Sequence, residues 1–387
     1  MHDVILIGGG LANGLIAWRL KICQPNVRIL LVEQTASLGG NHTWSFYQRD
    51  LSSAQHAWIA PLVVQEWPAY EVRFPTHSRT LTTACYSVSS ERFHEVLVAA
   101  LGDNVLLEAT VSEINTDSVC INGRQYQASI IIDGRGHVTS DTMHYAFQKF
   151  VGHEVVLKKP HGQTLPIIMD ATVTQEDGYR FVYTLPFSLD RILVEDTYYS
   201  TRPELNFPAI RDKIGAYIAS RGWEIAHIVR EETGVLPISL SGNIHAFWRE
   251  KPSGLPCSGL RAGLFHATTG YSLLFAVRLA DEIAACKALD RESVYRLTRR
   301  FSVQQWRSQG FMRLLNRMLF FAGAPLQRYR LLQRFYRLPQ GLIERFYAAQ
   351  PSLRDKLRIL SGKPPVPVIA ALQALFNIKK ETSSKPS

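Results

Sequence analysis

The sequence predicts an α/β protein that contains a parallel sheet, an inserted β-rich layer and a helical C-terminal region. Three observations support this prediction. Residues 1–40 alternate apolar runs with a glycine-rich turn and a helical stretch. Short segments with strand character fill residues 141–255, and basic amphipathic helices dominate from residue 291 onward. At 387 residues, the chain is long enough for two or three domains.

The first forty residues have the pattern of a βαβ unit. Residues 4–7 (VILI) form an apolar run, Gly8-Gly9-Gly10 follow, and a second apolar run ends at Glu33. In such units the glycines let the backbone approach a pyrophosphate, the helix N-terminus supplies free N–H groups, and the acidic residue binds a ribose hydroxyl. We therefore predict a Rossmann-type nucleotide-binding domain, in which the contacts of this unit are Gly8, Gly10, Leu11 and Glu33.

The glycine pattern departs from G-x-G-x-x-G at its third position. Asn13 stands there and Gly14 follows it, which the sequence alone does not explain. Glu33 is followed by Gly39-Gly40 in an E-x5-G-G arrangement that looks like the flavoprotein type of this unit. We therefore expect FAD rather than NAD, with Gly40 among the contacts.

A second nucleotide contact is expected at the end of another buried strand. Residues 89–101 have helical periodicity with a serine cap, and Asn122-Gly123 is a hairpin signal. Residues 128–132 then form an apolar run that ends at Asp133-Gly134. A strand that ends in Asp-Gly resembles the second flavin-contacting motif of flavoproteins, although a plain surface turn has the same pattern. The nucleotide-binding domain would thus span 1–140.

The chain returns to this domain over residues 256–290. We expect a short strand at 260–264 and then a long helix, which residues 266–273 open and which runs to about Lys287. Gly270, Tyr271 and Ser272 open that helix, whose N-terminal N–H groups would stabilise negative charge on a flavin ring. An ordinary capped helix, with Thr269 as cap, is the alternative.

An acidic pair stands out in the β-rich domain of residues 141–255. Glu195 and Asp196 lie inside a strand of branched and aromatic residues, so their side chains should point to opposite faces. Only one carboxyl group can then enter a pocket, where apolar surroundings would raise its pKa and make it a proton donor near neutral pH. The alternatives are that both acids are solvated, or that one pairs with an arginine such as Arg191.

The C-terminal quarter carries the positive charge of the chain. Residues 291–387 contain 19 Lys and Arg against 4 Asp and Glu, whereas residues 1–290 contain 24 against 29. Arginine mixed with Phe, Tyr and Leu on helices indicates a membrane-surface region, with a final apolar helix over 368–378. A purely structural helical cap is the main alternative, and nucleic-acid binding is a weaker one.

Composition narrows the remaining possibilities. The five cysteines are scattered without a C-x-x-C pair, which argues against a disulfide framework and a structural zinc site. No run is apolar enough to span a bilayer, and the chain opens directly in a predicted strand, which leaves no room for a signal peptide. We expect a cytoplasmic protein associated peripherally with the inner face of the cell membrane.

Several motifs together resemble the bacterial lycopene β-cyclases of carotenoid biosynthesis. These motifs are G-G-G-L-A-N-G, G-G-N-H-T-W-S-F, L-V-E-D-T and H-A-T-T-G-Y-S-L, with R-F-Y-R-L-P and L-I-E-R-F-Y near the C-terminus. The resemblance extends over nearly the whole chain. It implies an FAD-dependent isomerase that closes the ends of lycopene into β-rings without net oxidation, with the flavin kept reduced by NAD(P)H.

The resemblance also assigns roles to residues. It maps the family's acid motif onto residues 193–197, so Glu195 becomes the catalytic acid. Plant relatives are also acidic at the position of Asp196, so the resemblance does not fully separate the role of Asp196 from that of Glu195. Trp44, Phe46 and Tyr183 are candidates for lining the pocket. Two other functions remain open: a flavin-dependent monooxygenase or reductase acting on an isoprenoid lipid, and a prenyl-lipid-binding protein without catalysis.

Overall fold

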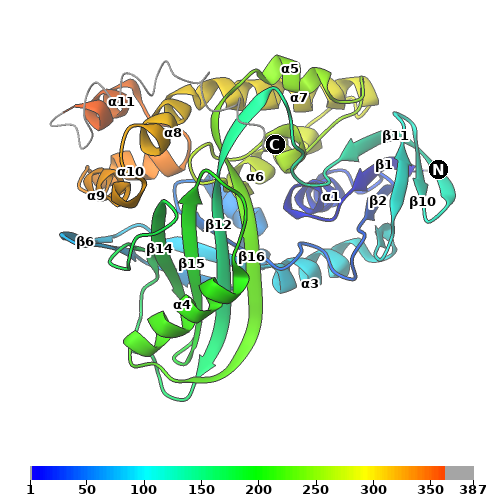
Figure 1. The fold of residues 1–387 in the computed structure, drawn as a ribbon. Helices are drawn as coiled ribbons and strands as arrows, with labels where there is room; N and C mark the ends of the chain where they lie inside the picture. Colours follow the sequence, from blue (N-terminus) through cyan, green and yellow to red (C-terminus); the bar gives the residue numbers. More distant parts are fainter. Residues whose placement is uncertain (1, 362–387) are drawn as a thin grey trace, which may run out of the picture.

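A mixed six-stranded sheet forms the first layer of the protein. The computed structural model describes residues 2–361. The sheet has the order β8-β2-β1-β11-β10-β9, and its first four strands are parallel. Its strands are β1 (His2–Ile7), β2 (Ile29–Val32), β8 (Val105–Leu106), β9 (Val111–Ile114), β10 (Ser118–Ile121) and β11 (Arg124–Asp133). This arrangement confirms the predicted Rossmann-type α/β class, and the layer lies on the right in Figure 1.

Three helices cover one face of this sheet. They are α1 (Leu11–Cys23), α3 (Ser90–Leu101) and α6 (Leu273–Ala284), and their buried side chains share one core with β1 and β2. The other face, with Ile5 and Ile7 of β1, packs in a separate core that includes Val119 and Ile121 of β10. Both faces of the parallel strands are therefore buried, which accounts for the continuous apolar runs. The predicted helix cap and hairpin are confirmed: the Ser89 side chain caps α3, and Asn122-Gly123 joins β10 to β11 with φ of 48° and 76°.

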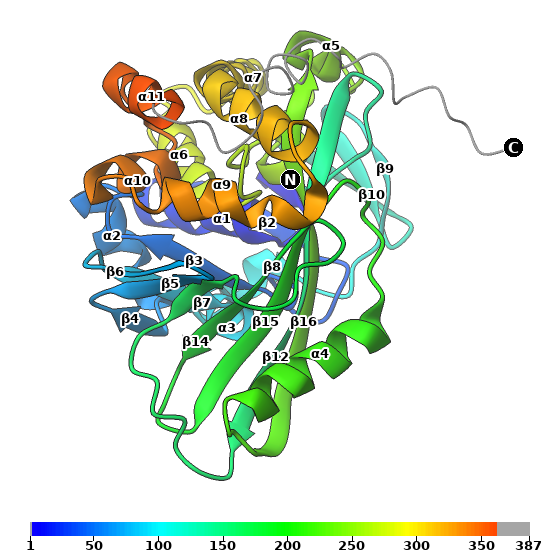
Figure 2. The ribbon, with the colours of Figure 1, turned by 60° about the vertical axis from the view of Figure 1, so that its left-hand side comes forward.

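A second sheet of seven strands stands beside the first. Its order is β16-β12-β15-β14-β13-β5-β6. The members are β5 (Tyr70–Phe74), β6 (His77–Leu81), β12 (Met143–Leu157), β13 (Ile167–Asp170), β14 (Tyr179–Pro186), β15 (Arg191–Ser200) and β16 (Ile225–Gly242). Helix α4 (Phe207–Ser220) crosses one face of the long strands, as Figure 2 shows. Since β5 and β6 come from residues 70–81, the inserted sheet extends beyond the predicted 141–255.

A small third sheet and a short helix connect the two larger layers. The sheet has the order β3-β7-β4, from β3 (Thr43–Tyr47), β4 (Gln65–Trp67) and β7 (Cys85–Ser89). Helix α2 (Ser53–Ile59) follows β3 along the chain and begins with a capping box at Ser52. This segment carries the aromatic-rich stretch of the sequence, and it brings Thr43 and Trp44 to the boundary between the layers.

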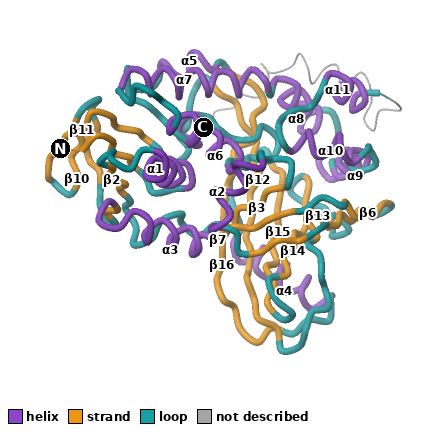
Figure 3. The backbone as a smooth tube through the Cα atoms, turned by 180° about the vertical axis from the view of Figure 1, so that it is seen from behind, coloured by secondary structure: helices purple, strands orange, loops and turns teal. Residues whose placement is uncertain are grey.

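The C-terminal helices pack into the core of the protein. They are α7 (Arg291–Ser308), α8 (Gly310–Phe321), α9 (Tyr329–Phe335), α10 (Gln340–Tyr347) and α11 (Leu353–Leu360), and they lie along one side of the molecule with α5 (Ile244–Arg249) (Figures 1 and 3). Asn316 Nδ2 donates to the carbonyls of Ser239 and Ala267, each at 2.8 Å. Removal of these helices would therefore expose core residues. The predicted helix at 368–378 lies outside the described residues.

Two predictions near residue 265 were wrong, namely the strand at 260–264 and the alternative helix cap at Thr269. Residues 260–264 are not a strand, because a 3-10 turn, Gly259–Ala262, is set by left-handed glycines at Gly259 (φ 54°) and Gly263 (φ 69°). Helix α6 begins at Leu273 and ends at Ala284, with Ser272 as its N-cap but no capping bond from the serine side chain, so Thr269 is not the cap. Over residues 2–361, none of the helices has the length and apolar character needed to cross a bilayer.

Candidate functional site

A cavity of about 630 Å³ lies where the two large sheets meet. Its walls come from the glycine turn after β1, the β2 end, the segment before β3, and the facing side of β12, β14, β15 and β16. The predicted site residues that line it are Gly8, Gly10, Leu11, Glu33, Gly40, Gly134, Glu195, Gly270, Tyr271 and Ser272. Asp133 and Asp196 are the two predicted site residues that are not part of this lining.

Gly8 lies so close to the backbone of Gly134 that only a residue without a side chain fits at this position. Gly8 has φ of 90°, and a Cβ there would lie 3.0 Å from the carbonyl oxygen of Gly134. The turn therefore lets β1 and β11 end side by side with their backbones facing the cavity. Glu33 Oε2 accepts from the Gly9 N–H at 2.7 Å, and Glu33 Oε1 accepts from Thr35 N and Oγ1, each at 2.9 Å. The carboxylate thus also braces the turn.

Asn13 is a buried connector between three segments. Its side chain is 1% exposed, its Nδ2 donates to the Ile7 carbonyl at 2.8 Å, and its Oδ1 accepts from Ser258 Oγ at 2.6 Å. This amide joins the end of β1 to the segment that returns at residue 258. Gly14 provides the close packing instead: a Cβ there would lie 2.4 Å from Phe93 Cζ on α3.

Asp133 supports the cavity wall from behind. The carboxylate is 2% exposed and forms ion pairs at 3.0 Å with Arg135 and Arg261. Burial raises the pKa of Asp133, but the hydrogen bond from Arg135 and the charges of both arginines outweigh burial and leave the pKa below its usual value. Arg135 itself lines the cavity, so Asp133 holds a cation at the end of the cavity near Gly8 and Gly134.

The loop before α6 reaches the cavity with a bent backbone. Gly270 has φ of 74° and donates its N–H to the His266 carbonyl at 2.8 Å, so this donor is already used. Because α6 begins at Leu273, the N–H groups of its first turn, rather than that of Gly270, lack an intrahelical acceptor. Ser272 and Leu273, at the start of that turn, line the cavity.

Glu195 enters the cavity from β15. Its side chain is 8% exposed, and Thr197 Oγ1 donates to its Oε1 at 2.7 Å. Burial raises the pKa of Glu195 well above its usual value, and the nearby Glu232 carboxyl group raises it further. A carboxyl group in this position is an acid at neutral pH, which suits proton donation to an apolar molecule.

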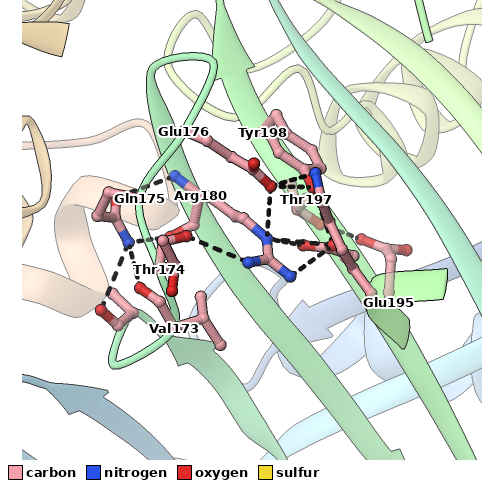
Figure 4. A network of polar contacts seen from close by, with 11 residues as sticks. Val173, Thr174, Gln175, Glu176, Arg180, Glu195, Thr197 and Tyr198 are labelled. Carbon is pink, nitrogen blue, oxygen red and sulfur yellow. Dashed lines mark hydrogen bonds and ion pairs between the residues drawn. The ribbon is translucent and has the colours of Figure 1, made fainter. Parts of the chain in front are cut away.

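Asp196 points to the opposite face of the same strand. Arg180 Nε and Nη2 contact its carboxylate at 2.9–3.1 Å, and Tyr198 Oη donates to Oδ2 at 3.0 Å. Figure 4 shows Arg180 beside residues 173–176, with Glu195 lying away from Arg180. Arg191 pairs with Glu154 instead. Asp196 has no access to the cavity, and we therefore propose a structural role for it rather than the predicted catalytic one.

The sequence reading missed Glu232, the second carboxyl group at this place. It is 1% exposed on β16, and its carboxyl group lies near enough to that of Glu195 to raise the pKa of Glu195. Its Oε2 accepts from Thr43 Oγ1 and from Arg230 Nη1, each at 2.8 Å. Glu231-Glu232 was a visible signal in the sequence, but only the strand register brings Glu232 beside Glu195.

Aromatic side chains line part of the cavity. Trp44 and Tyr183 belong to its lining, whereas Phe46 is buried in the core and does not. Tyr183 lies opposite Glu195 in the β14–β15 pair and donates from Oη to Ser45 Oγ at 2.8 Å. Phe150 and Gln148 of β12 complete the wall near the two glutamates.

Two solved structures share the fold of this chain. One is a geranylgeranyl bacteriochlorophyll reductase-like protein from Thermoplasma acidophilum, with a TM-score of 0.62 and 11% identity over 94% of this chain and 96% of that one. The other is a flavin-dependent brominase, with a TM-score of 0.59 and 10% identity over 90% and 93%. At these identities the likeness concerns the fold alone.

Sequence comparison places the chain more closely. It is 54% identical over 378 residues to a lycopene beta-cyclase from Pseudescherichia vulneris, which covers 97% of this chain and 98% of that one. It is 52% identical over 376 residues to a lycopene beta-cyclase from Pantoea ananas, with coverages of 97% and 98%. The family model described as lycopene cyclase protein matches residues 3–373. The chain therefore belongs to the lycopene cyclase family.

Proposed function

We propose that this chain is a lycopene β-cyclase that converts the linear ends of lycopene into β-rings, giving γ-carotene and then β-carotene. Membership of the family and the names of the close relatives support the substrate. The observation that carries the mechanism is the buried Glu195 carboxyl group, whose pKa burial raises well above its usual value, at a cavity whose other end has the glycine turn after β1.

The reaction is an isomerisation that requires only proton movement. A proton is added to the terminal double bond, the resulting cation is closed by the next double bond, and a proton is lost from the new ring. The number of electrons does not change. Glu195 gives the first proton from Oε2 or Oε1 and, once ionised, is the base nearest to the ring. The burial of this carboxyl group excludes the water that would otherwise capture the cation.

The residues present fit an FAD molecule. The positive φ of Gly8, the start of α1, Glu33 and Gly134 form one continuous wall of the cavity, as a pyrophosphate and a ribose require. Gly40, Gly270, Tyr271 and Ser272 would border the ring, with Arg135 on the anionic part. Reduced FAD, maintained by NAD(P)H, supplies a negatively charged ring that stabilises a nearby cation. Trp44 and Tyr183 offer further cation stabilisation from their ring faces.

The test of this function is Glu195→Gln with lycopene in liposomes and FAD held reduced. We expect loss of at least about 100-fold in cyclisation rate, because the general acid is removed. Flavin absorbance at wild-type stoichiometry is the control that the cavity is intact. Full activity of this variant would place the acid elsewhere and refute the assignment.

A redox function is the second candidate, because a reductase-like protein and a brominase share the fold. A monooxygenase or an isoprenoid reductase would consume one NAD(P)H for each product formed. The proposed cyclase would consume only what keeps the flavin reduced. Counting NAD(P)H oxidised per ring formed under anaerobic conditions separates the two.

We also propose that the protein works at the cytoplasmic membrane surface. Helix α11 exposes Leu353, Leu357 and Leu360, whose spacing of four and three residues puts them on one side of the helix. Arg354 and Arg358 are exposed beside them. An apolar stripe with flanking cations suits a helix lying in the headgroup region, which is where a hydrocarbon substrate is reached.

A further inference from the structure

We propose that Glu195 and Glu232 share one proton across Gly152, and that Glu232 is a positioning residue which keeps Glu195 in its acid form. This inference rests on the proposed cyclase function and deepens it. Glu232 acts through Glu195 and needs no contact with the substrate.

The strand register creates the pair. Gly152 on β12 lies opposite Glu195 of β15 on one side and opposite Glu232 of β16 on the other. The two glutamates are thus separated by one strand and point to the same face. Gly152 has no side chain between them, and a Cβ there would lie 3.0 Å from Glu232 Cγ and 3.3 Å from Glu232 Oε1. The glycine leaves the space in which the carboxyl groups meet.

The two carboxyl groups have unequal surroundings. Glu232 Oε2 receives hydrogen bonds from Arg230 and from Thr43. Glu195 receives one from Thr197, and the nearby Glu232 carboxyl group raises its pKa. Two carboxylates in contact cannot both ionise near neutral pH. The negative charge therefore belongs on Glu232, beside the guanidinium, and the proton belongs on Glu195.

The other titratable groups around the pair are fixed near neutral pH. Arg230 also forms ion pairs with Glu154 at 2.6 Å and with Glu91 at 3.7 Å, so it remains a cation. Burial raises the pKa values of Tyr183 and Tyr271, which stay neutral. Burial and the charge of Arg230 lower the pKa of His42, which also stays neutral. Among these groups, the Glu195–Glu232 pair is therefore the one expected to lose a proton above pH 7.

The pair also balances the protons of the reaction. When Glu195 transfers its proton to the inner carbon of the terminal double bond, the cation forms at the dimethyl-bearing carbon and two adjacent carboxylates remain in the protein. Their repulsion makes Glu195 a stronger base, and it recovers a proton from the ring carbon after closure. One proton leaves and one returns, so no oxidant, reductant or external base is consumed.

The experiment measures the cyclisation rate against pH for Glu232→Gln with reduced FAD. Without the carboxylate at 232, Glu195 ionises at lower pH, so the alkaline limb of the profile should move down by at least about one pH unit. Below the new limb the variant should still cyclise, because Glu195 keeps its proton there, but more slowly, because no second carboxylate strengthens Glu195 as the base. The matched control is Glu231→Gln, whose carboxylate pairs with Arg211 on the other face of β16 and should leave the limb unmoved.

A second variant and a spectroscopic measurement protect the test against misfolding. Gly152→Ala inserts a methyl group between the carboxyl groups and should shift the limb in the same direction. Infrared spectra at pH 8 should show the carboxylic-acid band of Glu195 in the wild type and its loss in Glu232→Gln. Burial raises the pKa of Asp50 to about 7, so this residue can also give a carboxylic-acid band. The spectrum of Asp50→Asn identifies that band.

The outcomes separate this inference from the function on which it rests. If Glu195→Gln is inactive but Glu232→Gln and Gly152→Ala keep the wild-type limb and infrared band, the shared proton is refuted and the cyclase acid stands. If Glu195→Gln is fully active, the proposed acid itself fails. A limb that moves in both variants and not in Glu231→Gln supports the pair.

Discussion

Loss of the carboxyl group at Asp196 should lower the stability of the protein, whereas the same loss at Glu195 should abolish cyclisation and leave the stability nearly unchanged. Asp196 is fully buried and Arg180 is 8% exposed at its side chain, with contacts of 2.9–3.1 Å between them. Asp196→Asn leaves a buried guanidinium without its partner, which costs about 3–5 kcal/mol in the free energy of unfolding. Arg180 keeps its bond to the Thr174 carbonyl and a 3.8 Å contact with Glu176, so we expect the lower end of that range.

Glu195→Gln should change the free energy of unfolding by less than about 1 kcal/mol, because it replaces a neutral acid by a neutral amide of the same shape. Urea unfolding followed by circular dichroism measures both variants. A double variant, Arg180→Met with Asp196→Leu, should recover most of the loss, since it removes both charges. The reasoning is refuted if Asp196→Asn unfolds within about 1 kcal/mol of the wild type, or if it loses cyclisation with its stability intact.

Two further predictions concern Asn13 and α11. Asn13→Ala should lower the free energy of unfolding by about 2–4 kcal/mol, because it leaves Ser258 Oγ buried without its acceptor. The double variant with Ser258→Ala should lose less stability than the sum of the two single variants. A loss below about 0.5 kcal/mol for Asn13→Ala would contradict the connector role. Replacing Leu353, Leu357 and Leu360 by serine should weaken binding to anionic vesicles at least about tenfold, because exposed leucines contribute the apolar contact. Leu189→Ser, a similar change at a residue that is 78% exposed on a loop of the second sheet, should leave vesicle sedimentation unchanged, and unchanged sedimentation of the triple variant would contradict docking through α11.

These point variants replace a simpler deletion of the C-terminal quarter. From sequence, residues 291–387 looked like an appended surface region because their charge differs from the rest. In the structure, Val294, Phe301 and Phe346 are part of the main core. A deletion would thus unfold the protein and say nothing about membrane binding.

Local patterns predicted the elements that local forces stabilise. Few residue types suit the backbone conformations of three such features, so the residue types in the sequence predicted them. These features are the glycine turn at residue 8, the serine cap of α3 and the Asn122-Gly123 hairpin. The strand at 260–264 was wrong because two left-handed glycines interrupt an apolar run.

The sequence by itself determined the α/β class, the nucleotide turn and the alternation that separates Glu195 from Asp196. Those features depend on residues close together in the chain. The tertiary structure alone decided the neighbours of each carboxyl group. Asp196 forms an ion pair with Arg180, and Glu195 lies beside the carboxyl group of Glu232. Register between strands far apart in sequence sets those partners, and so does the missing side chain at Gly152. Pairing across distant strands depends on how whole layers pack, which no local pattern encodes.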